Sequence, residues 1–97
     1  GQQGFGKIKE GQKVILKVDS YPSTEFGYLT GLVTYLSSIP SRQDSFLVKV
    51  SLTHGLQTNY NKYIFFRNDL KAKAEVITEE QRLFKRLIGQ LKQLGAR

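Results

Sequence analysis

Side chains capable of acid–base or nucleophilic chemistry are few and scattered in this sequence. The single histidine, His54, stands between Thr53 and Gly55, and there is no cysteine. A general base or an activated nucleophile needs a second polar group within hydrogen-bond reach, and no such partner is apparent for His54. Without cysteine, disulfides, thiolate metal ligands and a cysteine nucleophile are excluded. We therefore expect His54 to be a solvated turn residue and assign no catalytic, metal-binding or cofactor-binding residue.

The acidic side chains and the N-terminal glycines have structural explanations. Asp19 stands directly before residues 20–22, where an aspartate usually hydrogen-bonds the following backbone; its alternative use is a partner contact. Glu79 and Glu80 suit the positively polarised start of a helix. The glycines within residues 1–6 follow no strand, so they indicate a flexible end rather than a phosphate-binding loop.

The chain is basic, with fifteen Lys and Arg against eight Asp and Glu and a net charge of +7. This balance points toward a nucleic-acid partner, but the basic residues are dispersed, as on an ordinary solvated surface. No apolar run approaches the roughly 20 residues of a membrane span, and the N-terminus has no signal-peptide pattern. The densest basic group could contact an acidic lipid, a protein or a phosphate equally well, and consists of Arg82, Lys85, Arg86 and Lys92.

The periodicity of apolar residues predicts a mainly β fold followed by a helix. A loop rich in turn-forming residues is expected at residues 37–45. From Thr78 the period changes from 2 to 3.6 residues, which predicts an amphipathic helix over residues 78–94. The strands are expected at residues 13–19, 28–36, 46–52, 63–66 and 70–77.

The predicted fold class is a small antiparallel β-barrel of five or six strands with one C-terminal amphipathic helix. A chain of 97 residues has room for one such domain. We divide it into a flexible N-terminal lead-in (1–12), the barrel (13–77), the helix (78–94) and a tail (95–97).

One face of each predicted strand is apolar and should form the core. In the second strand, Leu29, Val33 and Tyr35 fall on one face, and Leu32 and Leu36 fall on the other. Small residues in the last strand suit a tight interior. The predicted core consists of Val14, Leu16, Val18, Val33, Val48, Val50, Leu70, Ala74 and Val76.

The predicted C-terminal helix has a clear start and an apolar stripe. Thr78 is the expected N-cap, with Gln81 three residues later as in a capping box. The stripe consists of Leu83, Phe84, Leu87, Ile88, Leu91 and Leu94. It must be buried either against the barrel of its own chain or against another chain or a membrane surface. For the second alternative, the candidate partner contacts are Arg82, Lys85, Arg86, Ile88, Leu91 and Leu94.

A structural turn is expected between the first and second strands. Pro22 has no N–H to donate and ends the strand ladder. Gly27 and Gly31 stand where a missing Cβ lets the backbone bend or another strand approach closely. We expect both glycines to serve the backbone conformation or the close approach of a strand rather than to contact a ligand. The whole structural turn consists of Asp19, Tyr21, Pro22, Gly27 and Gly31.

An ordered series of residues closely resembles the β-barrel domain of HlyD-type secretion proteins, the periplasmic adaptor or membrane fusion proteins. The resemblance continues through residues 46–52 and 70–77 to Glu79 and Leu83 and covers about nine tenths of the chain. The family commonly has glycine where Asp69 stands and a basic residue where Gln81 stands. The series begins with Gly11, Val14, Leu16, Val18, Asp19, Tyr21, Pro22, Phe26, Gly27, Gly31 and Val33.

The resemblance implies a non-catalytic contact role in bacterial export or efflux. Such adaptors are anchored in the inner membrane of Gram-negative bacteria, extend through the periplasm and assemble as rings. They connect an inner-membrane transporter to a TolC-like outer-membrane channel. The absence of Met and the start at Gly1 suit a fragment of a longer gene product, the membrane-proximal barrel with its tail, although removal of an initiator Met would leave the same sequence.

A nucleic-acid module is the alternative from another class, although no nucleic acid is expected under the adaptor interpretation. Small five-stranded barrels bind single strands through a basic groove and exposed aromatic rings. In the opposing interpretation, Phe65 or Phe66 fills the core and the other packs beneath the helix. The residues that could form a nucleic-acid surface are Tyr60, Lys62, Tyr63, Phe65, Phe66 and Arg67.

Overall fold

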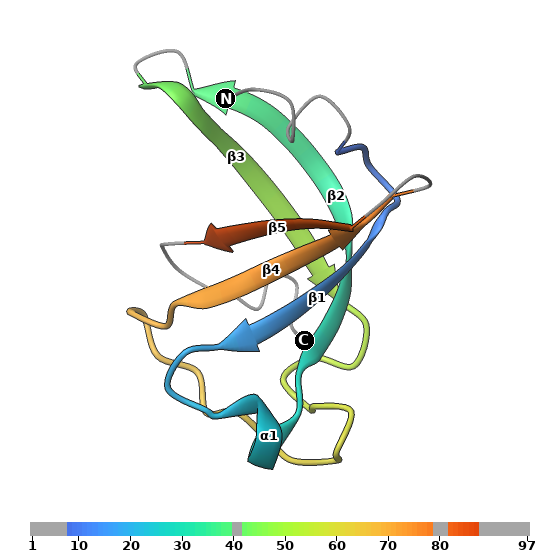
Figure 1. Ribbon diagram of the computed structural model, residues 1–97, viewed down its shortest axis with the longest axis vertical. Helices are drawn as coiled ribbons and strands as arrows, with labels where there is room; N and C mark the ends of the chain where they lie inside the picture. The colour runs from blue at the N-terminus through green and yellow to red at the C-terminus, as the bar shows by residue number, and fades with distance from the viewer. Residues whose placement is uncertain (1–7, 40–41, 79–81, 88–97) are drawn as a thin grey trace.

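The computed structural model describes residues 8–39, 42–78 and 82–87 and shows a mainly β domain. Five antiparallel strands form one sheet in the order β3-β2-β1-β4-β5 (Figure 1). The predicted class, a small mainly β antiparallel domain, is confirmed. The elements are β1 (Lys13–Val18), α1 (Ser23–Phe26), β2 (Leu29–Ile39), β3 (Arg42–Leu52), β4 (Ala72–Ile77) and β5 (Arg82–Leu87).

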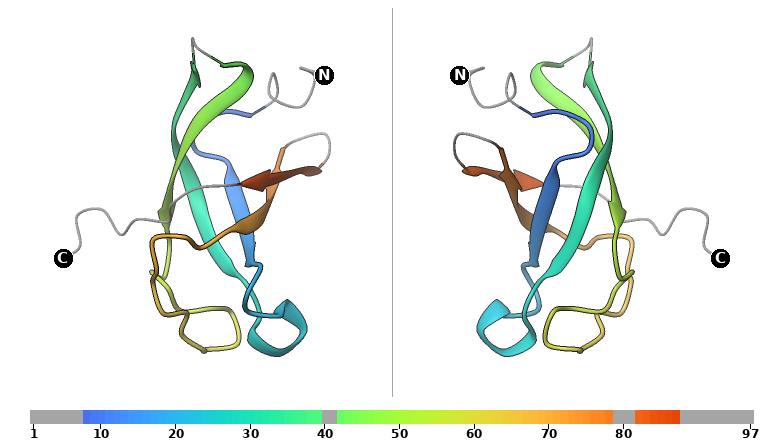
Figure 2. Two further views of the ribbon diagram at one scale, coloured as in Figure 1. Left: turned by 90° about the vertical axis from the view of Figure 1, so that its left-hand side faces the viewer. Right: turned by 90° about the vertical axis from the view of Figure 1, so that its right-hand side faces the viewer.

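The sheet is strongly twisted and open. The views in Figure 2 show the β2–β3 hairpin turned away from the β4–β5 pair, with β1 between them. No pairing joins the edge strands β3 and β5 among the described residues. The closed barrel expected from the sequence is therefore replaced, in this part of the chain, by a curled sheet. Right-handed strand twist accounts for the curl.

β1 lies at the centre of the sheet and determines the register on both sides. Leu16 is opposite Leu29 on β2 and Ala74 on β4. Val14 is likewise opposite Gly31 and Val76. Since successive side chains point to opposite faces of a strand, these pairs place apolar side chains on a single buried face.

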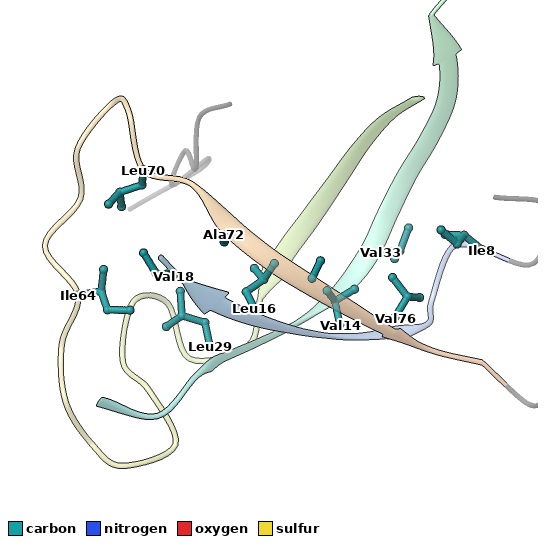
Figure 3. Packing of buried hydrophobic residues seen from close by; sticks show 11 residues of the cluster. Ile8, Val14, Leu16, Val18, Leu29, Val33, Ile64, Leu70, Ala72 and Val76 are labelled. Atoms are coloured by element: carbon teal, nitrogen blue, oxygen red, sulfur yellow. The ribbon is translucent and has the colours of Figure 1, made fainter. Parts of the chain in front are cut away.

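The buried face and the loops beside it form one hydrophobic core (Figure 3). Seven of the nine predicted core residues are buried, whereas Val48 and Val50 are half-buried and pack against the core. Ile64 and Leu70 close the end of the core near Val18 and Leu29 (Figure 3). The complete buried cluster is Ile8, Val14, Leu16, Val18, Leu29, Val33, Ile64, Leu70, Ala72, Ala74 and Val76.

The β2–β3 hairpin is longer than the sequence predicts. The strands reach Ile39 and begin again at Arg42, so the predicted loop at residues 37–45 is wrong for most of its length. The hairpin extends past the ends of β1 and β4 (Figure 1). A two-stranded ribbon beyond the sheet has no need of a continuous apolar face, so turn-forming residues such as Ser37 and Ser38 are accommodated there.

A register shift in β2 changes which side chains face the core. The shift lies between Val33 and Tyr35, as in a β-bulge that adds one residue to a strand. Leu36 then packs against the core, whereas Tyr35 is exposed. The predicted face of Leu29, Val33 and Tyr35 is therefore wrong at Tyr35, because strict alternation does not continue through a bulge.

The fourth predicted strand, at residues 63–66, does not form. The segment makes one isolated bridge, between Tyr63 and Gln57. Nearby backbone groups bond within the loop, since the Thr58 N–H donates to the Lys62 carbonyl at 2.7 Å. In this segment Ile64 is buried whereas Tyr63, Phe65 and Phe66 are exposed, so it is a loop with one inward position and not a strand in the sheet.

The predicted helix over residues 78–94 is contradicted where the structure describes it. Residues 82–87 form β5, whose backbone pairs with β4 from Ala72↔Leu87 to Ile77↔Arg82. A six-residue segment with mixed apolar and basic residues fits either period, and β4 offers an unpaired edge whose N–H and C=O groups need partners. Tertiary pairing therefore overrides the helical pattern. The other predicted helical positions, residues 79–81 and 88–94, lie outside the described residues.

The predicted lead-in comprises residues 1–12. Its last five residues, 8–12, pack against the sheet. Ile8 belongs to the buried core. The Gly11 N–H donates to the Val33 carbonyl at 2.7 Å, and the Val33 N–H donates to the Gln12 carbonyl at 2.9 Å. Residues 8–12 thus continue the domain before β1 begins, while residues 1–7 lie outside the described residues.

We expect Gly31→Ala to destabilise the domain by about 1 to 3 kcal/mol, the usual cost of overpacking. A Cβ at Gly31 would lie 2.6 Å from both the Ser51 carbonyl oxygen and Val50 Cγ1, and a backbone atom in β3 cannot move aside cheaply. Urea denaturation followed by circular dichroism measures the change.

Gly11→Ala is the matched control, because Gly11 has a φ of +92° but an added Cβ would meet no atom within 4 Å beyond its chain neighbours. It should cost only the strain of the left-handed backbone, about 1 to 2 kcal/mol. An unchanged urea midpoint for Gly31→Ala would contradict the close approach of β3.

Candidate contact surface at the α1 end of the sheet

The chain turns sharply where β1 ends. The Asp19 N–H donates to the Lys71 carbonyl at 2.8 Å, and the Tyr21 N–H donates to the Val18 carbonyl at 3.0 Å. Pro22 then precedes α1, a single helical turn that was not predicted and that follows the expected break at Pro22. The Pro22 carbonyl accepts from the Phe26 N–H at 2.8 Å. The predicted structural turn is therefore a compact corner with its own hydrogen bonds.

Gly27 joins this corner to a distant loop. It has a φ of +86°, and an added Cβ would overlap the side-chain oxygen of Asn59. That oxygen, Asn59 Oδ1, accepts from the Tyr28 N–H at 2.7 Å. The Asn59 N–H in turn donates to the Tyr28 carbonyl at 3.0 Å. The missing side chain at Gly27 thus allows Asn59 to attach residues 53–66 to the start of β2.

Thr58 organises the loop from within. Its side chain is buried, and its Oγ1 accepts from the N–H groups of Tyr60 at 3.1 Å and Lys62 at 3.2 Å. The Asn61 N–H donates to the Thr58 carbonyl at 2.9 Å, with Asn61 in the left-handed region at a φ of 63°. The Ile64 N–H donates to the Leu56 carbonyl at 3.0 Å. The loop is therefore held by its own bonds, without being part of the sheet.

Four aromatic side chains of this loop are exposed, and we call them the aromatic surface: Tyr60, Tyr63, Phe65 and Phe66. Their exposed fractions are 51%, 56%, 74% and 38%, in that order. Ile64, between Tyr63 and Phe65, is buried and takes the place in the core. The prediction that Phe65 or Phe66 fills the core is therefore wrong. A single inward position is available in this part of the loop, and Ile64 occupies it.

Side chains of the corner support the aromatic surface from behind. The Tyr21 hydroxyl accepts from the Phe65 N–H at 3.1 Å, across 44 residues of sequence. The Tyr21 and Phe26 rings meet edge to face, with centroids 5.1 Å apart. Lys62 Nζ lies 5.6 Å from the centroid of the Phe26 ring, within the range of a cation–π contact. The corner and the loop lie together at one end of the molecule, and the β2–β3 hairpin extends toward the other (Figure 1).

The remaining predicted site residues lie elsewhere or outside the described structure. Arg82, Lys85 and Arg86 are on β5, the edge strand beyond β4. Ile88, Leu91 and Leu94 lie outside the described residues. His54 is an exposed turn residue and Asp19 is exposed beside the corner.

Neither a metal-ligand cluster nor a membrane-spanning helix occurs among the described residues. No three His, Cys, Asp or Glu side chains come together there as metal ligands. The same part of the chain contains no helix of the length and apolarity needed to cross a bilayer. Among the described residues, Phe65 of the aromatic surface is the most exposed large apolar side chain, at 74%.

A smaller exposed apolar group lies on the outer face of the hairpin. Leu32 and Tyr35 on β2 and Leu47 on β3 are each more than two fifths exposed. Lys49 Nζ lies 5.2 Å from the centroid of the Tyr35 ring and covers part of it. These side chains project from the outer face of the β2–β3 hairpin, so they provide controls of similar exposure for the aromatic surface.

We expect Tyr21→Phe to loosen the loop while preserving the sheet. The variant keeps the ring contact with Phe26 but removes the hydroxyl that accepts from the Phe65 N–H, at a cost of about 0.5 to 1.5 kcal/mol. Hydrogen exchange should become faster in residues 63–66 and remain unchanged in β1. Equal exchange rates in the two proteins would show that this bond does not hold the loop.

Comparison with known proteins gives a local similarity. Over 29 residues, the chain is 57% identical to the leukotoxin export protein LtxD of Aggregatibacter actinomycetemcomitans. The matched segment makes up 30% of this chain and 6% of that protein. No protein-family profile matches the chain, and no solved structure matches it. The similarity thus connects part of this chain with part of a toxin export protein.

Proposed function

We propose that this chain is a non-catalytic contact module of a bacterial export system, of the HlyD type that its sequence resembles. The local similarity to a leukotoxin export protein supports an export-related role. The residues that carry the resemblance also build a specific structure, because Tyr21 and Gly27 form the corner that positions the aromatic surface. The resemblance and the unusual surface thus involve the same part of the fold.

The exposed rings of the aromatic surface are the main structural support for a contact role. Monomeric domains seldom expose concentrated apolar side chains without a use, and aromatic residues are enriched where proteins make contacts. Phe65 is 74% exposed although its backbone is fixed by Tyr21. A fixed loop loses less conformational entropy when it binds than a mobile one does. The geometry therefore suits contact with another component.

The family that the sequence resembles suggests where the chain acts and which proteins it contacts. The chain would act at the periplasmic face of the inner membrane of a Gram-negative bacterium, within a homo-oligomeric ring of the intact protein. Its partners would be an inner-membrane transporter and neighbouring adaptor subunits, with a TolC-like channel reached through the intact protein. Arg82, Lys85 and Arg86 on β5 remain candidate contacts for these protein partners.

Binding of single-stranded nucleic acid is a second candidate, because its aromatic residues are exposed rather than buried. Bases stack on exposed rings, but a basic groove must also track the phosphates. In the described segment, Lys62 lies over the Phe26 ring, and Arg67 lies 3.3 Å from an Asp69 carboxylate oxygen. The surface is thus richer in rings than in a continuous row of charges, and we favour the export role.

We expect the double variant Tyr63→Ser, Phe65→Ser to reduce export in the intact protein without unfolding the domain. Both side chains are exposed, so each change should alter stability by about 0.5 kcal/mol or less. Secreted substrate is measured against the amount of adaptor in the membrane fraction. The matched control, Tyr35→Ser with Leu47→Ser, removes similarly exposed side chains from the hairpin and should leave export near its normal level.

Normal export by the folded Tyr63→Ser, Phe65→Ser variant would contradict the contact role of the aromatic surface. Equal losses in both double variants would indicate a general loss of surface apolarity rather than a specific contact.

A further inference from the structure

We infer that the outer face of β1 and β4 binds an acidic segment of a partner protein. Three exposed lysines form this basic face: Lys13 and Lys17 on β1, and Lys73 on β4. The basic face shares no residue with the aromatic surface, so its role does not depend on contacts made by that surface.

Strand register gathers lysines that are scattered in the sequence. Every second residue of β1, beginning with Val14, is buried in the core. Because successive side chains point to opposite faces of a strand, Lys13 and Lys17 lie on the outer face. The two alanines of β4 are buried in the same way, which places Lys73 on that face too. Lys17 and Lys73 are directly opposite each other, and Arg86 is the residue of β5 paired with Lys73.

The stability of the sheet does not explain this arrangement. Like charges directly opposite each other on adjacent strands are destabilising, and Lys17 and Lys73 are such a pair. Lysine on an edge strand can protect that edge from pairing with another chain. However, β1 is the central strand and β4 lies next to it (Figure 1). A carboxylate bound between Lys17 and Lys73 would remove their repulsion.

The acidic residues around the basic face leave its exposed charge positive. Glu75, outward-facing on β4, is only 8% exposed and offsets at most one of the three lysines. Asp19, beyond the end of β1, is beside Lys71, whose carbonyl accepts from the Asp19 N–H; these two exposed residues carry opposite charges. In the turn before β1, Lys9 and Glu10 also carry one charge of each sign.

The composition of the two strands favours a protein segment over a nucleic acid or a bilayer. Neither β1 nor β4 contains an aromatic residue, whereas single-stranded nucleic acid stacks its bases on rings. Three lysines are also few for the continuous charge of a duplex. Both strands are described throughout, and neither carries an exposed large apolar side chain, although binding to a bilayer depends on burying apolar groups.

The spacing of the lysines suits carboxylates on a peptide. Opposite residues on paired strands have Cβ atoms about 5 Å apart, so the two oxygens of one carboxylate can accept from both Lys17 and Lys73. Lys13 and Lys17 are four residues apart, roughly 14 Å along an extended strand. An extended partner segment with acidic residues at the same spacing would match both positions. Ile15, half-buried between them, leaves room for a small apolar contact.

Titration of the isotope-labelled chain with an oligoglutamate peptide at physiological salt tests the inference. Amide resonances of β1 and β4 should shift, most strongly at Lys17 and Lys73, and those of residues 60–66 should not. In fluorescence anisotropy with a labelled peptide, Lys17→Gln and Lys73→Gln should each weaken binding about two- to fivefold. Lys62→Gln is the matched control, because it removes an exposed charge from the loop and should leave binding near its normal level.

Reversal of one charge links the binding to the register. Lys17→Glu places opposite charges across β1 and β4, so it should raise the midpoint of urea denaturation while it weakens oligoglutamate binding about tenfold. Lys17→Arg keeps the charge and should change neither measurement appreciably. Circular dichroism confirms that each variant is folded.

Three results would overturn the inference. Equal weakening by Lys17→Gln and Lys62→Gln would indicate unspecific attraction to a basic chain. An absence of shifts in β1 and β4 would remove the basic face as the binding site. Binding of a DNA duplex or of phosphatidylglycerol vesicles that depends on Lys17 and is tighter than binding of oligoglutamate would identify phosphate as the ligand. Export that depends on Tyr63 and Phe65 after any of these results would leave the proposed function intact.

Discussion

The structure depends on the pairing of β1 with β2 on one edge and with β4 on the other. Leu16 lies between Leu29 and Ala74 across both ladders, so one strand aligns the apolar faces of the three central strands. The pairing also fixes where the chain must turn. Val18 is the last β1 residue paired with β4, and the hydrogen bond from Asp19 N–H to the Lys71 carbonyl begins the corner. The aromatic surface is therefore positioned, through the corner, by the centre of the sheet.

The corner shows how an irregular loop can be fixed without belonging to a sheet. Gly27 leaves space for the Asn59 side chain, and Thr58 satisfies the N–H groups that a strand ladder would otherwise pair. Ile64 then anchors the loop in the core. Of these residues, Thr58 and Ile64 are buried, while Asn59 bonds the Tyr28 N–H at the surface. The outward positions are left for rings that the fold itself does not need.

Sequence periodicity predicts the strands in which residues alternate between core and solvent. It does not predict the bulge in β2, the pairing of β5 or the exposed rings of the loop. It predicts β1 and β4 closely, because Val14, Leu16 and Val18 alternate without interruption. It places Tyr35 on the wrong face, because a bulge is a property of two paired strands and leaves no mark in the periodicity of one. It predicts a helix in place of β5, because the partner edge on β4 is not visible in those six residues. It does not predict the exposure of Phe65 and Phe66, because hydrophobicity alone favours burial, although Ile64 beside them competes for the core.

The residues that anchor the loop differ from the residues that it exposes, so the two sets respond differently to substitution. Thr58 and Ile64 are buried, so substitution at either position disturbs the loop and the core together. Phe65 contributes its backbone N–H to the bond with Tyr21, while its side chain is largely outside the fold. The side chains at Tyr63 and Phe65 can therefore vary with little effect on folding, because the free energy that holds the loop comes from other atoms.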